Sequence, residues 1–307
     1  MNMNIMTDAC SACFKRQENE IINIGKTLLD EGTVDAVLAY ADSEAGIGAV
    51  PRFFRKAEDL ASMRWNEACT PNLAKYLPGA KGKIAVAAKP CDARAIVMYM
   101  VEKQVDRNNI YIIGIECAGL KGKDGMPAAG CSECTVRTPP VYDVLVKNPD
   151  VSGNPEQNNG QIPREKSVQY EEQSIEQKFE RFRNELQKCI MCYTCRQACY
   201  GCYCKVCFAE RDLPGWMPAD MDMGMKMEFH LGRAMHLAGR CVECGACERV
   251  CPSGVRIRYL IKEITALCRE LYGYSAGMDP DETPALANFS EKDREVGFLG
   301  GECDGTC

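Results

Sequence analysis

The sequence predicts an α/β N-terminal domain with a parallel-strand βαβ core, followed by a mostly helical domain. Two observations lead to this fold class. In the first half, two apolar runs of strand length flank a segment with helical spacing. In the second half, two cysteine runs with the same spacing are separated by a segment long enough to hold a helix. A chain of 307 residues is also long enough for two domains with separate cores.

The predicted elements of the N-terminal domain alternate in type. A helix follows the second strand candidate, and Asp92 is a plausible N-cap for it. A strand, a crossover helix and another strand form a parallel pair, almost always with a right-handed connection. The expected helices are residues 19–31, residues 71–77 and the helix after Asp92, and the expected strands are 34–40, 83–88 and 110–115.

A first group of cysteines follows the ends of these strands. In open parallel sheets, ligands bind beyond the carboxyl ends of the strands. Cys91 and Cys117 each follow such an end, and Cys131 and Cys134 come after a glycine-rich loop that can fold back over it. We predict that these four residues hold a 4Fe–4S cluster. Cys69 could replace one of them, and the alternative is a set of buried structural cysteines.

The second half is organised around its two cysteine runs, each spelling C-x2-C-x2-C-x3-C. This is the ligand pattern of a 4Fe–4S cluster, in which three cysteines surround the cubane and the fourth often comes from the other run. Structural zinc sites usually have two separated C-x2-C pairs instead, so a zinc-binding interaction protein is the weaker alternative. The runs consist of Cys189, Cys192, Cys195 and Cys199, and of Cys241, Cys244, Cys247 and Cys251. They predict two 4Fe–4S clusters in a helical, ferredoxin-like domain.

The segment after the first run leaves one ligand open. Tyr200 stands where a proline is expected, and Cys202, Cys204 and Cys207 are surplus to the pattern. The fourth ligand could therefore be Cys199, Cys202 or Cys204, and we prefer Cys199.

Other candidate groups are few. A helix with apolar residues from Ile175 to Leu186 leads into the first cysteine run. His230 and His236 lie on a later helix but six residues apart, so they do not share a face, and we expect neither to be a metal ligand. The methionine-rich residues 217–227 favour core packing over a docking surface. The cysteines near the chain ends stay unassigned, namely Cys10, Cys13, Cys303 and Cys307.

Composition and charge exclude several classes of protein. The chain is 46% hydrophobic and 26% charged, as in ordinary globular proteins. Its net charge of −6 argues against nucleic-acid binding, which usually requires a basic face. Residues 1–20 lack the apolar segment of a secretory signal, and no apolar run approaches a membrane span. We expect a cytoplasmic protein of an anaerobic cell, with its 21 cysteines kept reduced for metal.

Two parts of the chain resemble known families. Residues 88–95, Ala-Lys-Pro-Cys-Asp-Ala-Arg-Ala, with the strand at 110–117 and the C-x2-C pair, resemble the beta subunits of deazaflavin (coenzyme F-420) hydrogenases and formate dehydrogenases. The later cysteine runs are similar to iron–sulfur subunits of heterodisulfide-reductase-linked complexes. The resemblance covers most of residues 20–275. It implies cluster-ligand positions for the four N-terminal cysteines and FAD in deazaflavin-reducing members, although no G-x-G-x-x-G phosphate loop is present here.

These observations predict an iron–sulfur electron-transfer subunit of a redox complex rather than an independent catalyst, because no acid–base constellation of side chains is evident. Its expected partners are a heterodisulfide-reductase-like module and a hydrogenase, formate dehydrogenase or NAD(P)H-oxidising flavoprotein module. The alternative is an FAD-containing oxidoreductase that reduces a deazaflavin carrier. The expected divisions are an α/β domain at 1–146, a linker at 147–171, the ferredoxin-like domain at 172–275 and a C-terminal tail at 276–307.

Overall fold

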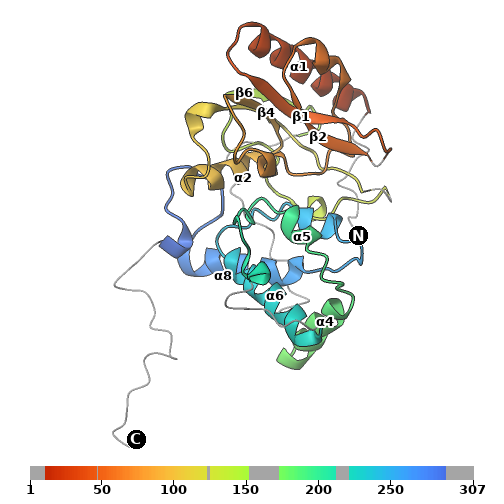
Figure 1. Ribbon diagram of the computed structural model, residues 1–307, viewed down its shortest axis with the longest axis vertical. Helices are drawn as coiled ribbons and strands as arrows, with labels where there is room; N and C mark the ends of the chain where they lie inside the picture. Colours follow the sequence, from red (N-terminus) through yellow and green to blue (C-terminus); the bar gives the residue numbers. More distant parts are fainter. Residues whose placement is uncertain (1–10, 47, 123–124, 152–172, 212–220, 288–307) are drawn as a thin grey trace, which may run out of the picture.

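The computed structural model describes residues 11–46, 48–122, 125–151, 173–211 and 221–287. These residues form an α/β half at one end of the molecule and a helical half at the other (Figure 1). Most of the predicted linker lies outside the described residues, as do Cys10, Cys303 and Cys307.

The α/β half is built on a mixed sheet, which confirms the predicted fold class for this part of the chain. Its strand order is β2–β1–β4–β5–β6, and β3 also pairs with β1. The strands β1, β4, β5 and β6 are parallel, whereas β2 and β3 pair with β1 in antiparallel fashion. The strands are β1 (Ala36–Asp42), β2 (Ala49–Phe54), β3 (Met63–Arg64), β4 (Ile84–Ala88), β5 (Ile110–Ile115) and β6 (Val144–Val146).

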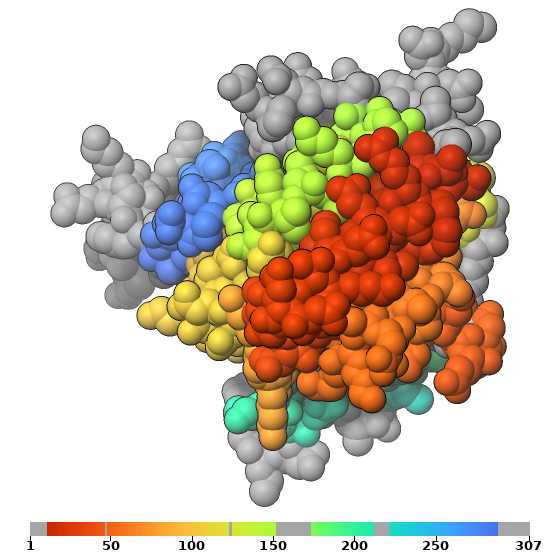
Figure 2. Space-filling view, turned by 90° about the horizontal axis from the view of Figure 1, so that it is seen from above, coloured from red at the N-terminus to blue at the C-terminus, as the bar shows by residue number. Residues whose placement is uncertain are grey.

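Two helices cover the opposite faces of this sheet (Figure 1). One is α1 (Ser11–Asp30), which begins earlier than the predicted helix, and Figure 2 shows it lying across the surface. The other is α2 (Pro90–Val101), which connects β4 to β5 as the predicted crossover. The region predicted as a helix at 71–77 forms only a short 3-10 helix, Leu73–Tyr76.

The start of α2 corrects one prediction. Lys89, not Asp92, is the N-cap residue, because the chain is still extended there and turns helical at Pro90. Asp92 lies in the first turn, where its carboxylate accepts hydrogen bonds from the backbone N–H of Lys89 and of Leu73, both at 2.9 Å. The Asp92 carboxylate therefore satisfies a backbone N–H group at the start of α2 and also links this helix to the segment that contains Leu73.

The second half is helical, and its longer helices pack beside the two cysteine runs. Of the apolar face predicted between Ile175 and Leu186, only the last turns are covered: Phe182 and Leu186 are buried, while Ile175 is 81% exposed. Whether this half is ferredoxin-like stays a prediction. The helices are α4 (Ile175–Gln187), α5 (Thr194–Gln197), α6 (Met223–His236), α7 (Ala246–Arg249) and α8 (Arg258–Tyr272).

The helical half has apolar clusters of its own and also contributes residues to the core of the sheet. Tyr200, Val242 and Tyr274 from the helical half are buried together with residues of the sheet. On α2, Arg94 donates to the Ala276 carbonyl oxygen at 2.8 Å, and the Tyr99 hydroxyl donates to the Tyr200 carbonyl oxygen at 2.6 Å. The helical half is therefore hydrogen-bonded to α2, the helix that carries Cys91. Among the described helices, none is long and apolar enough to cross a membrane.

Candidate metal centres

The two cysteine runs have the same backbone conformation at equivalent positions. In the first run Met191 and Tyr193 have φ angles of 54° and 57°, and in the second run Glu243 and Gly245 have φ angles of 57° and 74°. A short helix begins after the second cysteine of each run and contains the third cysteine, α5 in the first run and α7 in the second. For a residue other than glycine this left-handed conformation costs about 1–3 kcal/mol, and such costs concentrate at functional sites. The same strained backbone conformation in both runs therefore indicates that each run forms part of a functional site.

The left-handed conformation directs backbone N–H groups at cysteine sulfur. Met191 N lies 3.4 Å from Cys189 Sγ, and at the equivalent place Glu243 N lies 3.3 Å from Cys241 Sγ. An N–H donor stabilises a thiolate more than a neutral thiol, and the thiolate is the form that binds metal. Hydrogen bonds to sulfur also raise the reduction potential of an iron–sulfur cluster. The donor geometry thus fits a cluster as well as the cysteine spacing does.

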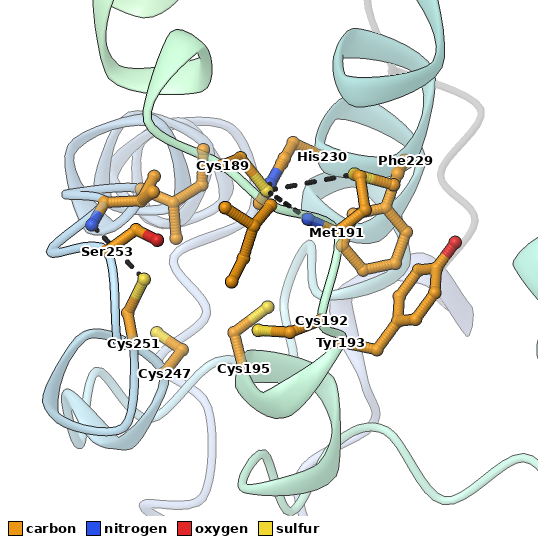
Figure 3. Close-up of a pocket in the computed structure, with 13 residues that line it drawn as sticks. Cys189, Met191, Cys192, Tyr193, Cys195, Phe229, His230, Cys247, Cys251 and Ser253 are labelled. Carbon is orange, nitrogen blue, oxygen red and sulfur yellow. Dashed lines mark hydrogen bonds between the residues drawn. The ribbon is translucent and has the colours of Figure 1, made fainter. Parts of the chain in front are cut away.

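The first candidate site, which we call the outer site, consists of Cys189, Cys192, Cys195 and Cys251. All four line one pocket (Figure 3), and Cys247 of the second run also lines it, so the second run closes this pocket. Cys251 comes from the second run, and its Sγ accepts from the backbone N–H of Val255 at 3.3 Å. Cys192 is exposed, so this site reaches the protein surface.

The second candidate site, the inner site, consists of Cys199, Cys241, Cys244 and Cys247. Burial is the main cause of the raised pKa of the last three thiols, and the nearby Cys199 raises each of them further. The fourth cysteine of each run therefore lies with the other run, the exchange considered from the sequence. A hydrogen bond from the adjacent Cys202 thiol, followed by the charge of Arg233, lowers the pKa of Cys199. The Cys199 and Cys202 thiols therefore lie together at the inner site, and Cys199 stays our predicted ligand.

The third candidate site, the edge site, consists of Cys91, Cys117, Cys131 and Cys134. Cys91 lies in the first turn of α2 and Cys117 follows β5, so the strand ends bring them to one edge of the sheet. Burial raises the pKa of Cys117 to about 12, and Cys131 and Cys134 contribute to this rise. The topology therefore gathers these four residues as the βαβ unit predicted.

The edge and inner sites adjoin one another. Burial and Asp92 are the main causes of the raised pKa of Cys91, and Cys244 of the inner site and Cys117 of the edge site add to them. Arg249 on α7 ties the same region together by donating to the Ala129 carbonyl oxygen at 2.6 Å. It also donates to the carbonyl oxygens of Cys244 and Thr70.

Close packing of the two segments requires glycine at this contact. A Cβ atom added to Gly245 would lie 1.9 Å from the Ala129 carbonyl oxygen, and one on Gly130 would lie 2.9 Å from the Glu243 carbonyl oxygen. Glu133, between the two edge-site cysteines of the loop, pairs with Lys262 of α8 at 2.7 Å. The loop that carries Cys131 and Cys134 is therefore fastened to the second cysteine run.

Cys69, considered from the sequence as a substitute ligand, occupies a different environment. It is fully buried, and its thiol donates to the Arg64 carbonyl oxygen at 3.6 Å. Burial raises its pKa to about 12. The positive charge of Lys89 lowers the pKa of Cys69, but by less than burial raises it. Lys89 is also buried and pairs with Asp92 at 2.8 Å.

Helix α6 brings two further side chains to the cysteines. His230 Nε2 lies 3.3 Å from Cys189 Sγ (Figure 3), and burial lowers the pKa of this histidine to about 4, so the ring is neutral. Arg233 is buried one turn further on and donates to the Cys195 carbonyl oxygen at 3.2 Å. Neither contact was expected from the sequence. The helical pattern indicates which residues share a face of α6, but not which part of the protein packs against that face. His236 packs instead against Phe208, with ring centroids 5.2 Å apart.

The donor chemistry of the three sites suits iron–sulfur clusters, because each set consists of four thiols supplied by curled or loop backbone. Around one zinc ion the thiolate sulfurs lie about 3.8 Å apart, as tetrahedral Zn–S bonds require. Among the residues that the structure describes, no group of three or more His, Cys, Asp or Glu side chains is arranged to hold a single metal ion.

No family model matches the chain, but relatives among known proteins extend over most of it. The chain is 25% identical to the F420-dependent formate dehydrogenase subunit beta of Methanocaldococcus jannaschii, over 86% of this chain and 92% of the relative. It is 27% identical to the F420-dependent formate dehydrogenase 1 subunit beta of Methanococcus maripaludis, over 85% of this chain and 91% of the relative.

Proposed function

Because the chain is related along most of its length to the beta subunits of F420-dependent formate dehydrogenases, as its motifs predicted, we propose that it is an iron–sulfur electron-transfer subunit of a redox complex. In this proposal its twelve site cysteines bind three 4Fe–4S clusters, and it works with other subunits rather than as an independent catalyst. When bound, such clusters accept and release single electrons.

The observation that carries the proposal is the contiguity of the three four-cysteine sites. In this assignment the outer site and the inner site each take one cysteine from the other run, so the two sites are adjacent. The inner and edge sites meet at Cys244 and Cys91. The order outer, inner, edge therefore spans both halves of the protein, as a path for electrons requires.

The chain's own residues give the outer and inner sites different surroundings. At the outer site Cys192 is exposed and the adjacent Ile190 is 59% exposed, so this end is open to a partner. At the inner site Val242 and Ala246 are buried beside the cysteines. Solvent exposure, hydrogen bonds to sulfur and local charge together set cluster potentials. We infer that electrons pass between partner subunits through the exposed outer end and the sheet edge.

The partners follow from the relatives and from the cysteine runs. We propose a formate dehydrogenase, hydrogenase or NAD(P)H-oxidising module on one side and a heterodisulfide-reductase-like module on the other. We also propose that the complex is cytoplasmic.

The test counts iron, acid-labile sulfide and released flavin per polypeptide in anaerobically purified protein. Three cubanes predict about twelve irons, at four irons per cluster. Replacing Cys251 with serine should remove the outer cluster and leave about eight irons, whereas replacing the exposed Cys204, which belongs to none of the three sites, should leave about twelve. About eight irons in the unmodified protein would remove the edge cluster from the proposal. Colourless protein with stoichiometric zinc would overturn it entirely.

A second candidate function is favoured by the relatives, whose names describe them as F420-dependent. In that case the chain would also bind FAD and reduce a deazaflavin, because a flavin converts between one-electron and two-electron chemistry. Stoichiometric FAD in the same preparation, with deazaflavin reduction by the protein, would establish this function. Full iron content without flavin would leave the electron-transfer subunit.

A further inference from the structure

Helix α6 carries a buried cation between the outer and inner sites. Arg233 is 3% exposed, and its Nη2 donates to the Cys195 carbonyl oxygen of the first cysteine run at 3.2 Å. Its charge also acts on the thiols of Cys199 and Cys247 of the inner site, of Cys195 of the outer site, and of Cys202 beside Cys199. A fully buried arginine is unusual unless it is paired, and here thiols surround it.

The same guanidinium has unused hydrogen-bonding capacity. Arg233 Nε is buried and has no hydrogen-bond partner in the part of the chain that the structure describes. Leaving such a donor unsatisfied costs about 1–3 kcal/mol. Negatively charged sulfur, either from thiolates or from a cluster, would compensate both the buried charge and the free donor.

His230, on the same face of α6 one turn earlier, contacts the outer site alone. Its Nε2 lies 3.3 Å from Cys189 Sγ, and the ring is 3% exposed. Once Cys189 is a thiolate it can only accept, so Nε2 must carry the proton and donate it in a hydrogen bond. One helix therefore presents a shared cation to two sites and a ring N–H donor to one of them.

We propose that Arg233 is a positioning residue that raises the reduction potentials of both the outer and the inner cluster, and that His230 raises the potential of the outer cluster alone. This inference rests on the proposed function, because it requires the clusters. Reduction adds one electron, and thus one negative charge, to a cluster. A buried positive charge stabilises that added charge, and so does an N–H donor on the ligand sulfur.

The experiment is an anaerobic redox titration of the full-length protein, with the reduced clusters followed by electron paramagnetic resonance. Arg233→Gln removes the charge but keeps polar nitrogen and oxygen, and Arg233→Lys keeps the charge as the matched control. His230→Phe removes the donor and keeps a planar ring. Iron and sulfide are counted for every variant, so that loss of a cluster is distinguished from a change in its potential.

We expect Arg233→Gln to lower the reduced-to-oxidised ratio of both C-terminal clusters at least tenfold at a fixed solution potential, a shift of about 59 mV for one electron. Arg233→Lys should change each ratio less than threefold, and His230→Phe should lower the outer cluster alone. The edge cluster should titrate as in the unmodified protein in all three variants.

Two results would overturn the inference while leaving the proposed function intact. One is an Arg233→Gln variant with full iron and unchanged potentials. The other is an Arg233→Lys variant with full iron in which the reduced-to-oxidised ratio of both clusters falls tenfold, because the charge would then not be the cause. This second result is decisive if Arg233→Gln loses its iron. Unmodified protein without iron would instead refute the proposed function.

Discussion

Replacing Asp92 with asparagine should strongly destabilise the α/β half. The carboxylate is fully buried and pairs with the Lys89 ammonium at 2.8 Å, while its two oxygens accept from the backbone N–H of Lys89 and Leu73. Burial alone would lower the pKa of Lys89, but Asp92 keeps it raised, so the lysine is charged in the folded protein. Asparagine offers one oxygen in place of two and removes the counter-charge.

The expected cost follows from this geometry. Removing one partner of a buried ion pair costs about 3–5 kcal/mol, because the other charge stays buried without compensation. Lys89 retains contacts with the Tyr40 hydroxyl and the Pro71 carbonyl oxygen, which favours the lower end of that range. With a urea m-value of about 2 kcal/mol/M, the unfolding midpoint should fall by about 1.5 M.

The assay is urea unfolding of anaerobic protein, followed by tryptophan fluorescence. Trp65 is buried 6.1 Å from the Tyr40 ring, so it reports on this core directly. Replacing Lys89 with methionine in the Asp92→Asn background should restore at least half of the lost stability, because no charge is then left buried. A single Asp92→Asn variant within about 1 kcal/mol of the unmodified protein would refute the reasoning.

Three further outcomes are expected. Gly245→Ala should lower the iron content of purified protein, measured by iron assay, because its Cβ would lie 1.9 Å from the Ala129 carbonyl oxygen. Burial would raise the pKa of Glu133, but its hydrogen bonds and charge interactions with Lys262 and Arg258 lower the pKa overall. A lowered carboxylate pKa stabilises the fold above the unfolded pKa, and this is lost as pH falls. Between about pH 5 and 3, the melting temperature should therefore fall more steeply in unmodified protein than in Glu133→Gln. Removing iron with a chelator should make the 188–211 segment the first site of limited proteolysis, because metal no longer holds its strained loop.

The elements that sequence analysis found most easily were those with a continuous apolar pattern. The strand predicted at 110–115 matches β5 in both bounds. By contrast, β2 contains Pro51 and an exposed arginine, and β6 has only three residues, so neither produced a recognisable pattern. Such strands are formed by pairing with neighbours rather than by their own residues.

The candidate sites could be predicted from the sequence to different extents. Cysteine spacing grouped residues within each run, and sheet topology brought Cys91 towards Cys117. Spacing could not separate Cys199 from Cys202, because Cys202 is only three residues away, and the two thiols also lie together in the folded protein. Arg233 could not be identified at all, since an arginine in a helical pattern is usually on a solvated face.

The exchange of fourth cysteines between the two runs has a consequence for biosynthesis. A ribosome that has made residues up to 199 has supplied only three of the four thiols for the outer site and one for the inner site. Neither set is complete until Cys247 and Cys251 have emerged, some fifty residues later, whereas the edge set is complete at Cys134. If these sites bind clusters as we propose, neither C-terminal cluster can gain its full set of protein ligands before the second run has been made. A protein truncated between the runs would have a complete ligand set only at the edge of its sheet.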